Sequence, residues 1–334
     1  MTYTRRDVCR MGLAALPAAG LLAAADRLWA APAKPDSVLG GVRIGTIAPY
    51  SFHNLPDDAH SVLQDLLTDN LSGCELQHYC AEQFAGAPAA AAPLARGGRG
   101  GGRRGGRAPL TPAQRAARAK AAAQLQAWRL SVSMDKFKQL RQLYNDAGVT
   151  IYALKLASGR FPAPMSQPEC EYAFNMAEAL GAQCLQIEFP EGKPEITQQL
   201  GAEAAKRKMM VGYHAHLDAS PRLWEGAMAQ SPYNGINLDI GHWIAAGNAG
   251  LLDFIRANHA RITTLHLKDR QNKAHGGKNV PWGEGDTPVA QVLQLMQANR
   301  YPFPGTIEFE YPVPAGFSSL KEVARCLQFC QKAL

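Results

Sequence analysis

The sequence predicts an α/β fold in which eight parallel strands close into a barrel. Eight short apolar or β-branched runs recur along the chain with helical patterns between them, which is the alternation of a parallel sheet. The units occupy about 290 residues, a length that suits eight of them. The first run lacks the G-x-G-x-x-G turn that would favour an open dinucleotide-binding sheet. We therefore predict a (β/α)8 TIM barrel rather than an open doubly wound sheet.

The predicted strands are short runs of branched and apolar residues. In chain order they cover residues 42–48, 73–77, 150–156, 182–189, 209–214, 235–239, 262–267 and 305–309. Apolar residues at helical spacing predict helices over residues 135–147, 167–180 and 319–333. Gly181 directly follows the second of these helices and is a typical helix stop.

One low-complexity segment interrupts the alternation after the second strand. Residues 85–110 are Ala/Pro-rich and then almost purely Gly and Arg, a composition that cannot bury a core. We expect a disordered insertion there, followed by a helix over residues 111–129 that opens with a Thr-Pro cap. Gly/Arg runs also resemble RNA-binding tails, but a solvated loop that binds anionic surfaces at most weakly is the simpler interpretation.

The first 33 residues have the three parts of an export signal. Arg5 and Arg6 precede an uncharged apolar stretch over residues 11–25, and small residues follow up to Ala33. The arginine pair indicates the twin-arginine route. We therefore expect a signal peptide over residues 1–33, a barrel domain over residues 40–334 and a periplasmic protein. The alternative is an uncleaved anchor, although the stretch is shorter than the ~20 residues that span a bilayer.

The formal charge of +7 at pH 7 comes mainly from two regions. Between Glu82 and Asp135 there are nine Lys or Arg and no acidic residue, and the signal adds more arginines. Because the remaining chain is slightly acidic, the charge does not indicate a nucleic-acid partner. Six of the seven cysteines lie outside the signal. Disulfides are an option in an oxidising compartment, but the cysteine positions favour buried free thiols, and none has zinc-site spacing.

Five successive apolar strands end on residues that can bind a metal or transfer a proton. These residues are Glu188, His214 with His216, Asp239, His266 and Glu308. Barrel enzymes place their active residues at the carboxyl ends of strands. Charged side chains at the ends of apolar strands are costly unless they serve a purpose. We therefore predict one active site at this end of the barrel.

Four of these residues form the predicted metal site: Glu188, Asp239, His266 and Glu308. Three carboxylates and one imidazole suit one divalent ion, Mn²⁺, Mg²⁺ or Co²⁺, with Zn²⁺ as an alternative. For each residue the competing interpretation is a structural ion pair. Glu310 shares a strand face with Glu308, so the last ligand could move by two residues.

Four motifs resemble those of the xylose-isomerase-like TIM barrels, the sugar phosphate isomerase/epimerase superfamily. They are GYHAH at 212–216, NLDIGH at 237–242, LHLKDR at 265–270 and VPWGEGD at 280–286. The resemblance extends over about Val42 to Leu334, apart from the insertion. The superfamily includes ketose 3-epimerases, hydroxypyruvate isomerase, inosose dehydratase and endonuclease IV.

The resemblance implies how the predicted site would work. Glu188, Asp239, His266 and Glu308 would hold the metal, and the two glutamates would also act as catalytic residues on opposite faces of a bound ketose. One glutamate would remove a proton next to the carbonyl, the metal would stabilise the enediolate, and the other glutamate would return a proton. Return to the opposite face gives epimerisation, return to the neighbouring carbon gives isomerisation, and loss of a β-substituent gives elimination.

Residues beside these strand ends are predicted to bind the substrate. The resemblance implies substrate contact for His242, and His216 is placed to hydrogen-bond a sugar hydroxyl. Lys155, at the end of the third strand, is expected to bind an oxyanion or else to form a salt bridge at the barrel rim. His214 is expected to pack in the barrel wall.

The segment after the seventh strand contributes three further residues. Asp269 and Arg270 are expected to orient His266 or to close the substrate pocket. Glu284 is either a lid residue or a plain loop charge.

The predicted function is a metal-dependent isomerase or epimerase of an unphosphorylated sugar or polyol, since phosphorylated sugars are cytosolic and the chain carries an export signal. One alternative is a lyase acting on keto-sugars or 3-keto-glycosides by β-elimination. Another is a non-catalytic periplasmic sugar-binding protein. A three-zinc nuclease is disfavoured. The expected partner is a small sugar, with no nucleic acid and no stable membrane span, and a homo-oligomer is left open.

Overall fold

The computed structural model describes residues 34–88 and 110–334. The predicted export signal over residues 1–33 lies outside these ranges, as do residues 89–109 of the predicted insertion. Both therefore remain predictions. Within the described ranges, no helix combines the length and the apolar character that crossing a bilayer requires.

Eight parallel strands form a closed sheet, as predicted. They are β2 (Val42–Ala48), β3 (Gly73–Gln77), β4 (Thr150–Lys155), β5 (Cys184–Glu188), β6 (Met210–His214), β7 (Asn234–Asp239), β8 (Ile262–Leu267) and β9 (Gly305–Ile307). Each strand pairs with the next, and β2 pairs with β9 to close the barrel. The short β1 (Val38–Leu39) pairs antiparallel with β2 and precedes the predicted strands.

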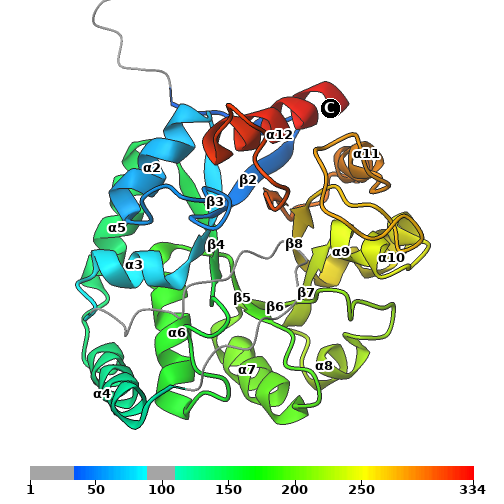
Figure 1. Cartoon of the computed structure of the whole chain (residues 1–334). Helices are drawn as coiled ribbons and strands as arrows, with labels where there is room; N and C mark the ends of the chain where they lie inside the picture. The colour runs from blue at the N-terminus through cyan, green and yellow to red at the C-terminus, as the bar shows by residue number, and fades with distance from the viewer. Residues whose placement is uncertain (1–33, 89–109) are drawn as a thin grey trace, which may run out of the picture. The chain divides into compact units, whose positions relative to one another are not determined.

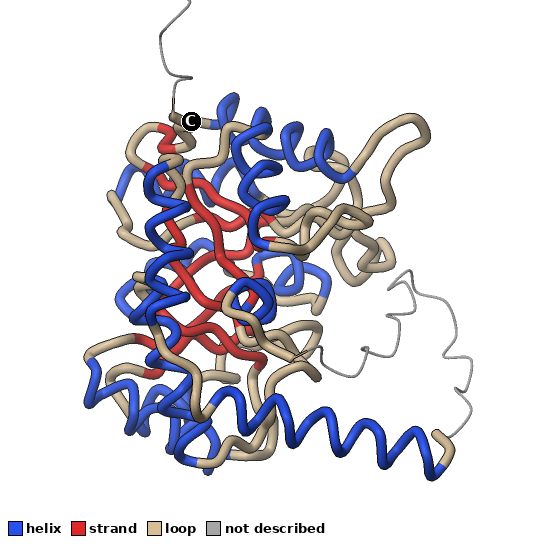
Figure 2. Tube along the Cα trace, turned by 90° about the vertical axis from the view of Figure 1, so that its left-hand side faces the viewer, coloured by secondary structure: helices blue, strands red, loops and turns tan. Residues whose placement is uncertain are grey.

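Helices surround the strands, as Figures 1 and 2 show. They are α2 (Ala59–Thr68), α3 (His78–Phe84), α4 (Pro112–Arg129), α5 (Asp135–Asp146), α6 (Gln167–Leu180), α7 (Pro194–Arg207), α8 (Glu225–Gln230), α9 (Ile240–Ala245), α10 (Leu251–Asn258), α11 (Val289–Asn299) and α12 (Ser319–Ala333), with a 3₁₀ turn over His259–Arg261. Their amphipathic faces pack on the outside of the sheet and form the main core together with its outward-facing side chains.

The boundaries of α6 show how local sequence sets an element. Ser166 and Glu169 form a capping box in which the Ser166 backbone N–H donates to Glu169 Oε2 at 2.9 Å. The helix ends at Gly181, whose φ of +74° is the left-handed conformation that glycine adopts most readily. A side chain there would also meet Arg141, since a Cβ would lie 2.5 Å from its Nε. The helix therefore covers the residues predicted.

Helix α4 begins with the predicted Thr111 cap and ends on a buried ion pair. The Thr111 hydroxyl and the Gln114 side chain form a capping box. At the other end, Arg129 donates to both carboxylate oxygens of Glu82 on α3, at 2.7 and 3.0 Å. This paired contact anchors an otherwise exposed helix to the barrel.

The described cysteines are all buried and free, which confirms the prediction of free thiols. Cys326 and Cys330 lie on α12, and burial raises their thiol pKa values, so both remain protonated and unreactive.

Polar side chains fill the barrel interior. The hydroxyls of Tyr152 and Thr306 hydrogen-bond at 2.8 Å, and Gln186 Nε2 donates to Thr263 at 3.0 Å. Gly45 leaves room for the Tyr152 ring, because a Cβ at that position would lie 2.5 Å from the Tyr152 hydroxyl. The barrel centre is therefore packed rather than open, and it supports the side chains at the strand ends.

Candidate active site

Four buried side chains meet at the carboxyl ends of the later strands. His214 on β6, Asp239 on β7, His266 on β8 and Glu308 after β9 offer ligand atoms that all lie within 4.8 Å of one another. Three of them belong to the predicted metal site, and His214 stands where Glu188 was expected. Two carboxylates and two imidazoles suit Mn²⁺, Co²⁺ or Zn²⁺ better than Mg²⁺, which prefers oxygen ligands.

The chemistry of Asp239 supports this fit. Its buried Oδ2 makes no well-aligned hydrogen bond with a described residue, but it is paired with the Lys268 ammonium, whose Nζ lies 2.9 Å away. A metal ion bound to this oxygen would share or replace that ion pair. Burial raises the pKa of Asp239 to about 7, against the opposing effect of the Lys268 ammonium. A buried carboxylate oxygen directed at a cluster of other ligands is well suited to a cation.

His214 was predicted to pack in the barrel wall, away from His216, and this prediction is wrong. Residues two apart on a strand point to the same face. The His214 ring accordingly lies 4.9 Å from the His216 ring and 4.7 Å from the His266 ring, centroid to centroid. Its Nδ1 donates to Asn237 Oδ1 at 2.5 Å, which leaves the Nε2 lone pair free. Burial lowers the pKa of His214 well below its usual value, so the ring is neutral and able to bind a metal.

Lys268 supplies a positive charge to the acidic cluster. Its Nζ lies 2.9 Å from Asp239 Oδ2, 3.0 Å from Glu308 Oε2 and 2.7 Å from Glu310 Oε2. Burial alone would lower the pKa of this ammonium, but the carboxylates of Asp239, Glu308 and Glu310 raise it well above its usual value. Glu310 also accepts a hydrogen bond from the Tyr50 hydroxyl and is not among the four clustered residues.

A chain of hydrogen bonds connects the cluster through the barrel interior. His214 donates to Asn237, and Asn237 Nδ2 donates to Thr264. The Thr264 hydroxyl donates to Glu75 Oε2 at 3.3 Å, and His266 Nε2 donates to Glu75 Oε1 at 3.1 Å. Glu75 is fully buried on β3. It holds the His266 ring in one orientation, as carboxylates do behind metal-binding histidines.

His266 also donates from Nδ1 to Glu308 Oε2, at 2.8 Å. Burial disfavours its charged form, but the carboxylates of Glu75 and Glu308 outweigh burial and raise the pKa of His266 to about 10. Burial would raise the pKa of Glu308, but Lys268 and His266 lower it well below its usual range. Glu308 is therefore an ionised carboxylate at neutral pH. A metal bound to His266 Nδ1 would replace the proton there.

Glu188 lies outside this four-residue cluster. Its Oε1 is 3.2 Å from Lys155 Nζ and its Oε2 is 3.6 Å from His216 Nε2. Burial would raise the pKa of Glu188, but Lys155 and His216 lower it, so this carboxylate is also ionised. The structure therefore joins Lys155 to Glu188, and it places His216 between Glu188 and the cluster, since the ligand atoms of His216 also lie within 4.8 Å of those of His214 and His242.

His242 faces the same cluster. Its backbone N–H donates to Asp239 Oδ1 at 2.7 Å, and Arg270 donates to its Nδ1 at 2.6 Å. Its Nε2 lies 3.3 Å from Lys268 Nζ. Arg270 thus orients His242, whereas the prediction was that it orients His266 or closes the pocket.

Asp269 organises the loop that follows β8. Its carboxylate accepts backbone N–H bonds from Gly283 at 2.8 Å, Gly285 at 2.9 Å and Thr287 at 3.2 Å. It shapes the segment that carries the exposed Glu284. These contacts order the loop and leave little capacity for direct substrate contact, and the role in closing the pocket stays a prediction.

Two important residues, Lys268 and Glu75, were not predicted, and a third, His214, was noticed at its strand end but assigned to the barrel wall. The same signals could have placed all three. His214 follows from the two-residue period of strands. Lys268 lies two residues after His266 and so shares its face. Glu75 is a charged residue within the otherwise uncharged run 73–77, which is the same anomaly that indicated the later strand ends.

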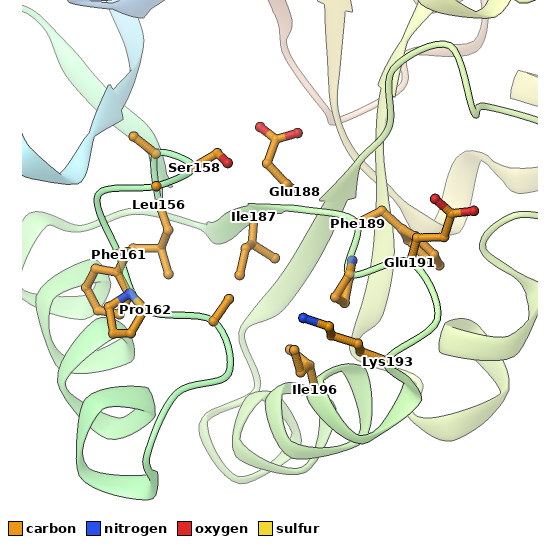
Figure 3. Close-up of a pocket in the computed structure, with 14 residues that line it drawn as sticks. Leu156, Ser158, Phe161, Pro162, Ile187, Glu188, Phe189, Glu191, Lys193 and Ile196 are labelled. Carbon is orange, nitrogen blue, oxygen red and sulfur yellow. The ribbon is translucent and has the colours of Figure 1, made fainter. Parts of the chain in front are cut away.

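A pocket of about 290 Å³ adjoins Glu188 at the same end of the barrel. Figure 3 shows Glu188 at its edge, with Phe161 and Pro162 on one side and Phe189 on the other. Ile187 and Ile196 lie between these walls.

Comparisons with known proteins agree with this architecture. The sequence model of the family described as xylose isomerase-like TIM barrel matches residues 115–330. An uncharacterized protein from Parabacteroides distasonis is 23% identical with a TM-score of 0.55, and the match covers 88% of this chain and 100% of that one.

Two other solved structures share the fold at lower identity. The 3-DHS dehydratase AsbF from Bacillus anthracis, described as probable, is 12% identical with a TM-score of 0.57 over 85% of this chain and 97% of that one. The 3-keto-D-glucoside 4-epimerase YcjR from E. coli is 10% identical with a TM-score of 0.54 over 87% and 99%. A search of curated proteins found no match.

Proposed function

We propose that this chain, which belongs to the xylose isomerase-like TIM barrel family, is a metal-dependent enzyme that isomerises or epimerises an unphosphorylated sugar or polyol. The observation that carries the proposal is the buried meeting of Asp239, His266 and Glu308 with His214. Such a set of carboxylates and imidazoles is costly to bury unless a cation or a reaction uses it.

The metal would be held by Asp239, His266 and Glu308, with His214 or Glu188 as the fourth ligand. When bound, one divalent ion supplies Lewis-acid polarisation of a substrate carbonyl and stabilises the negative charge that develops on its oxygen. Glu75 and Asn237 fix the orientation of the two histidines before any ligand arrives. This preorganisation is what keeps the cost of binding low.

Proton transfer would use the two ionised carboxylates. Glu308 follows β9 and Glu188 ends β5, and these strands are four apart in a closed sheet of eight. They therefore stand on opposite sides of the barrel mouth. A sugar bound between them would present one face to each carboxylate, so that one removes the proton next to the carbonyl and the other returns it. Return from the opposite side inverts the carbon.

A β-eliminating lyase is the second candidate. The neighbours in fold support it, since one is described as a dehydratase and another as an epimerase of a keto-glucoside. Elimination begins with the same removal of a proton next to a carbonyl and differs in what leaves afterwards. We further propose a periplasmic location, on the evidence of the arginine pair and apolar stretch in residues 1–33.

The test uses the purified full chain, loaded in turn with Mn²⁺, Co²⁺, Zn²⁺ or Mg²⁺, in deuterated water. Ketoses and 3-keto-glycosides are supplied, and NMR follows deuterium entry next to the carbonyl. Deuterium in an isomerised or epimerised sugar supports the proposal. An unsaturated sugar with enone absorbance supports the lyase instead. Ligand binding with no exchange and no product would contradict both and leave the sugar-binding alternative.

A further inference from the structure

The pocket beside Glu188 is mainly apolar. Its wall includes Leu156, Phe161, Pro162, Ile187, Phe189 and Ile196. These residues come from the end of β4, the connection to α6, the end of β5 and the start of α7. The polar side chains that line it are few, namely Ser158, Glu188, Glu191 and Lys193. In Figure 3 the Glu191 carboxylate points away from the labelled apolar side chains.

The pocket is continuous with the proposed reaction centre because Glu188 belongs to both. Glu188 lines the pocket and pairs with Lys155 and His216 at the barrel mouth. A substrate whose reacting carbon lies against Glu188 therefore has one end directed at the clustered residues and another directed at the pocket.

The aromatic wall is held in place from behind. The Arg129 guanidinium lies 4.3 Å from the centre of the Phe161 ring, and Arg129 is itself fixed by Glu82. Tyr172 stacks on Phe161 with ring centroids 6.4 Å apart, and His78 packs edge-on at 5.2 Å. The wall is thus formed before a ligand binds, which favours affinity because little ordering is required on binding.

An unsubstituted sugar would gain little from such a pocket. Sugar hydroxyls require hydrogen-bond partners, and an apolar wall leaves them unsatisfied. A ring without polar groups gains from leaving water and from contact with aromatic side chains. The pocket volume of about 290 Å³ is close to the lower end of the range for ligand pockets, so the pocket suits one small ring system.

We propose that this pocket binds an aryl substituent carried by the sugar, so that the substrate class is keto-sugars that carry an aryl group, such as aryl keto-glycosides. This inference rests on the proposed function for the position of the sugar. Binding of the ring, however, requires no turnover and can be measured separately.

The experiment compares phenyl β-D-glucopyranoside with methyl β-D-glucopyranoside as probes on the full-length protein. Calorimetry gives the two affinities, and saturation-transfer NMR shows which probe protons touch the protein. We expect the phenyl probe to bind about tenfold more tightly or better, as burial of an aromatic ring implies. We also expect the strongest saturation on its ring protons.

Two variants fill the pocket from opposite sides. Ser158→Trp and Lys193→Trp replace exposed residues that line it, so folding should be unaffected, which thermal unfolding would check. Each should remove the preference for the phenyl probe. Ala257→Trp, on exposed surface of α10, is the matched control and should keep it.

Equal affinity for the two probes would overturn the inference, as would no detectable binding of the phenyl probe at millimolar concentration. A preference that survives both pocket-filling variants would also overturn it, because the ring would then bind elsewhere. The outcomes are separable from the proposed function. If the aryl ring binds but no ketose or keto-glycoside is converted, the inference about the pocket holds and the proposed enzymatic function is contradicted.

Discussion

Glu308 and Glu188 are two ionised carboxylates at the same end of the barrel, but their surroundings differ. Glu308 is 6% exposed at its side chain and contacts both His266 and Lys268 at 3.0 Å or less. Glu188 is 28% exposed and contacts Lys155 at 3.2 Å and His216 at 3.6 Å. The first belongs to a network that spans several strands, and the second sits at the edge of a pocket.

The difference separates two tasks that the proposed reaction needs. The Glu308 side is rigid and charged, which suits holding a metal in a fixed geometry. The Glu188 side is more open and has few contacts, which suits a residue that must meet substrates and respond to them. Substitutions on the Glu308 side should therefore reduce metal binding and stability, whereas those on the Glu188 side should change the pH dependence of activity.

Glu308→Gln removes a proposed metal ligand and proton carrier together. We expect kcat/KM to fall by about 10³-fold or more, in line with the loss of general acid–base catalysis plus metal binding. Deuterium exchange on the best substrate measures it. Glu225→Gln, exposed on α8, is the control and should retain normal activity. If the Glu308→Gln protein exchanged deuterium at a near-normal rate, the proposed role of Glu308 in metal binding and proton transfer would be contradicted.

Lys268→Met leaves Asp239, Glu308 and Glu310 without their shared ammonium. Breaking a buried ion pair from one side typically costs about 3–5 kcal/mol, so we expect a loss of that order in the free energy of unfolding. Urea denaturation measures it. Added Mn²⁺ should restore part of the loss, because a cation would again neutralise the carboxylates. Lys138→Met, which breaks only an exposed pair with Asp135, should change little.

Glu75→Gln tests whether the interior network orients His266. Loss of a carboxylate behind a metal-binding histidine typically lowers metal affinity about 10–100-fold. We expect a decrease of this size for Mn²⁺, measured by calorimetry and by the Mn²⁺ EPR signal. Glu322→Gln is a matched control, since Glu322 is equally buried but lies on α12. Equal Mn²⁺ affinity in the wild type and Glu75→Gln would contradict the positioning role.

Lys155→Met tests whether Lys155 lowers the pKa of Glu188, and the readout is the pH dependence of kcat/KM. Burial tends to raise the pKa of Glu188, and Lys155 is the main group that lowers it. Without Lys155 the pKa of Glu188 should rise, so the carboxylate should become protonated at higher pH than in the wild type. The acidic limb of the kcat/KM profile should therefore move to higher pH, with metal affinity little changed. An unshifted limb would show that Glu188 does not control it.

Much of the fold could be predicted because it depends on local patterns. The strand over residues 262–267 and the helix over residues 167–180 match their predicted bounds, since apolar period, caps and a terminal glycine all lie within the segment itself. The strand over residues 305–309 ends earlier, at Ile307, although Glu308 N–H still donates to Leu267. Strand ends depend on neighbouring strands, which local patterns do not reveal.

The site was predicted less completely because its contacts are long-range. Asp239, His266 and Glu308 could be placed on strand ends from the sequence alone. The pairing of His266 with Glu75 joins positions 191 residues apart, and Glu188 pairs with Lys155 on another strand. Such partners emerge only when strand order and register bring them together. His214 differs, because correct use of the two-residue strand period would have found it.

The central claim is that Asp239, His266 and Glu308 hold one divalent metal. Metal analysis of the protein purified from its natural compartment without chelators tests it most directly, with Asp239→Asn measured in parallel. We expect one divalent ion per chain in the wild type and its loss in Asp239→Asn, with a folded barrel by circular dichroism. Three zinc ions per chain, or the same metal content in a folded Asp239→Asn protein, would contradict it.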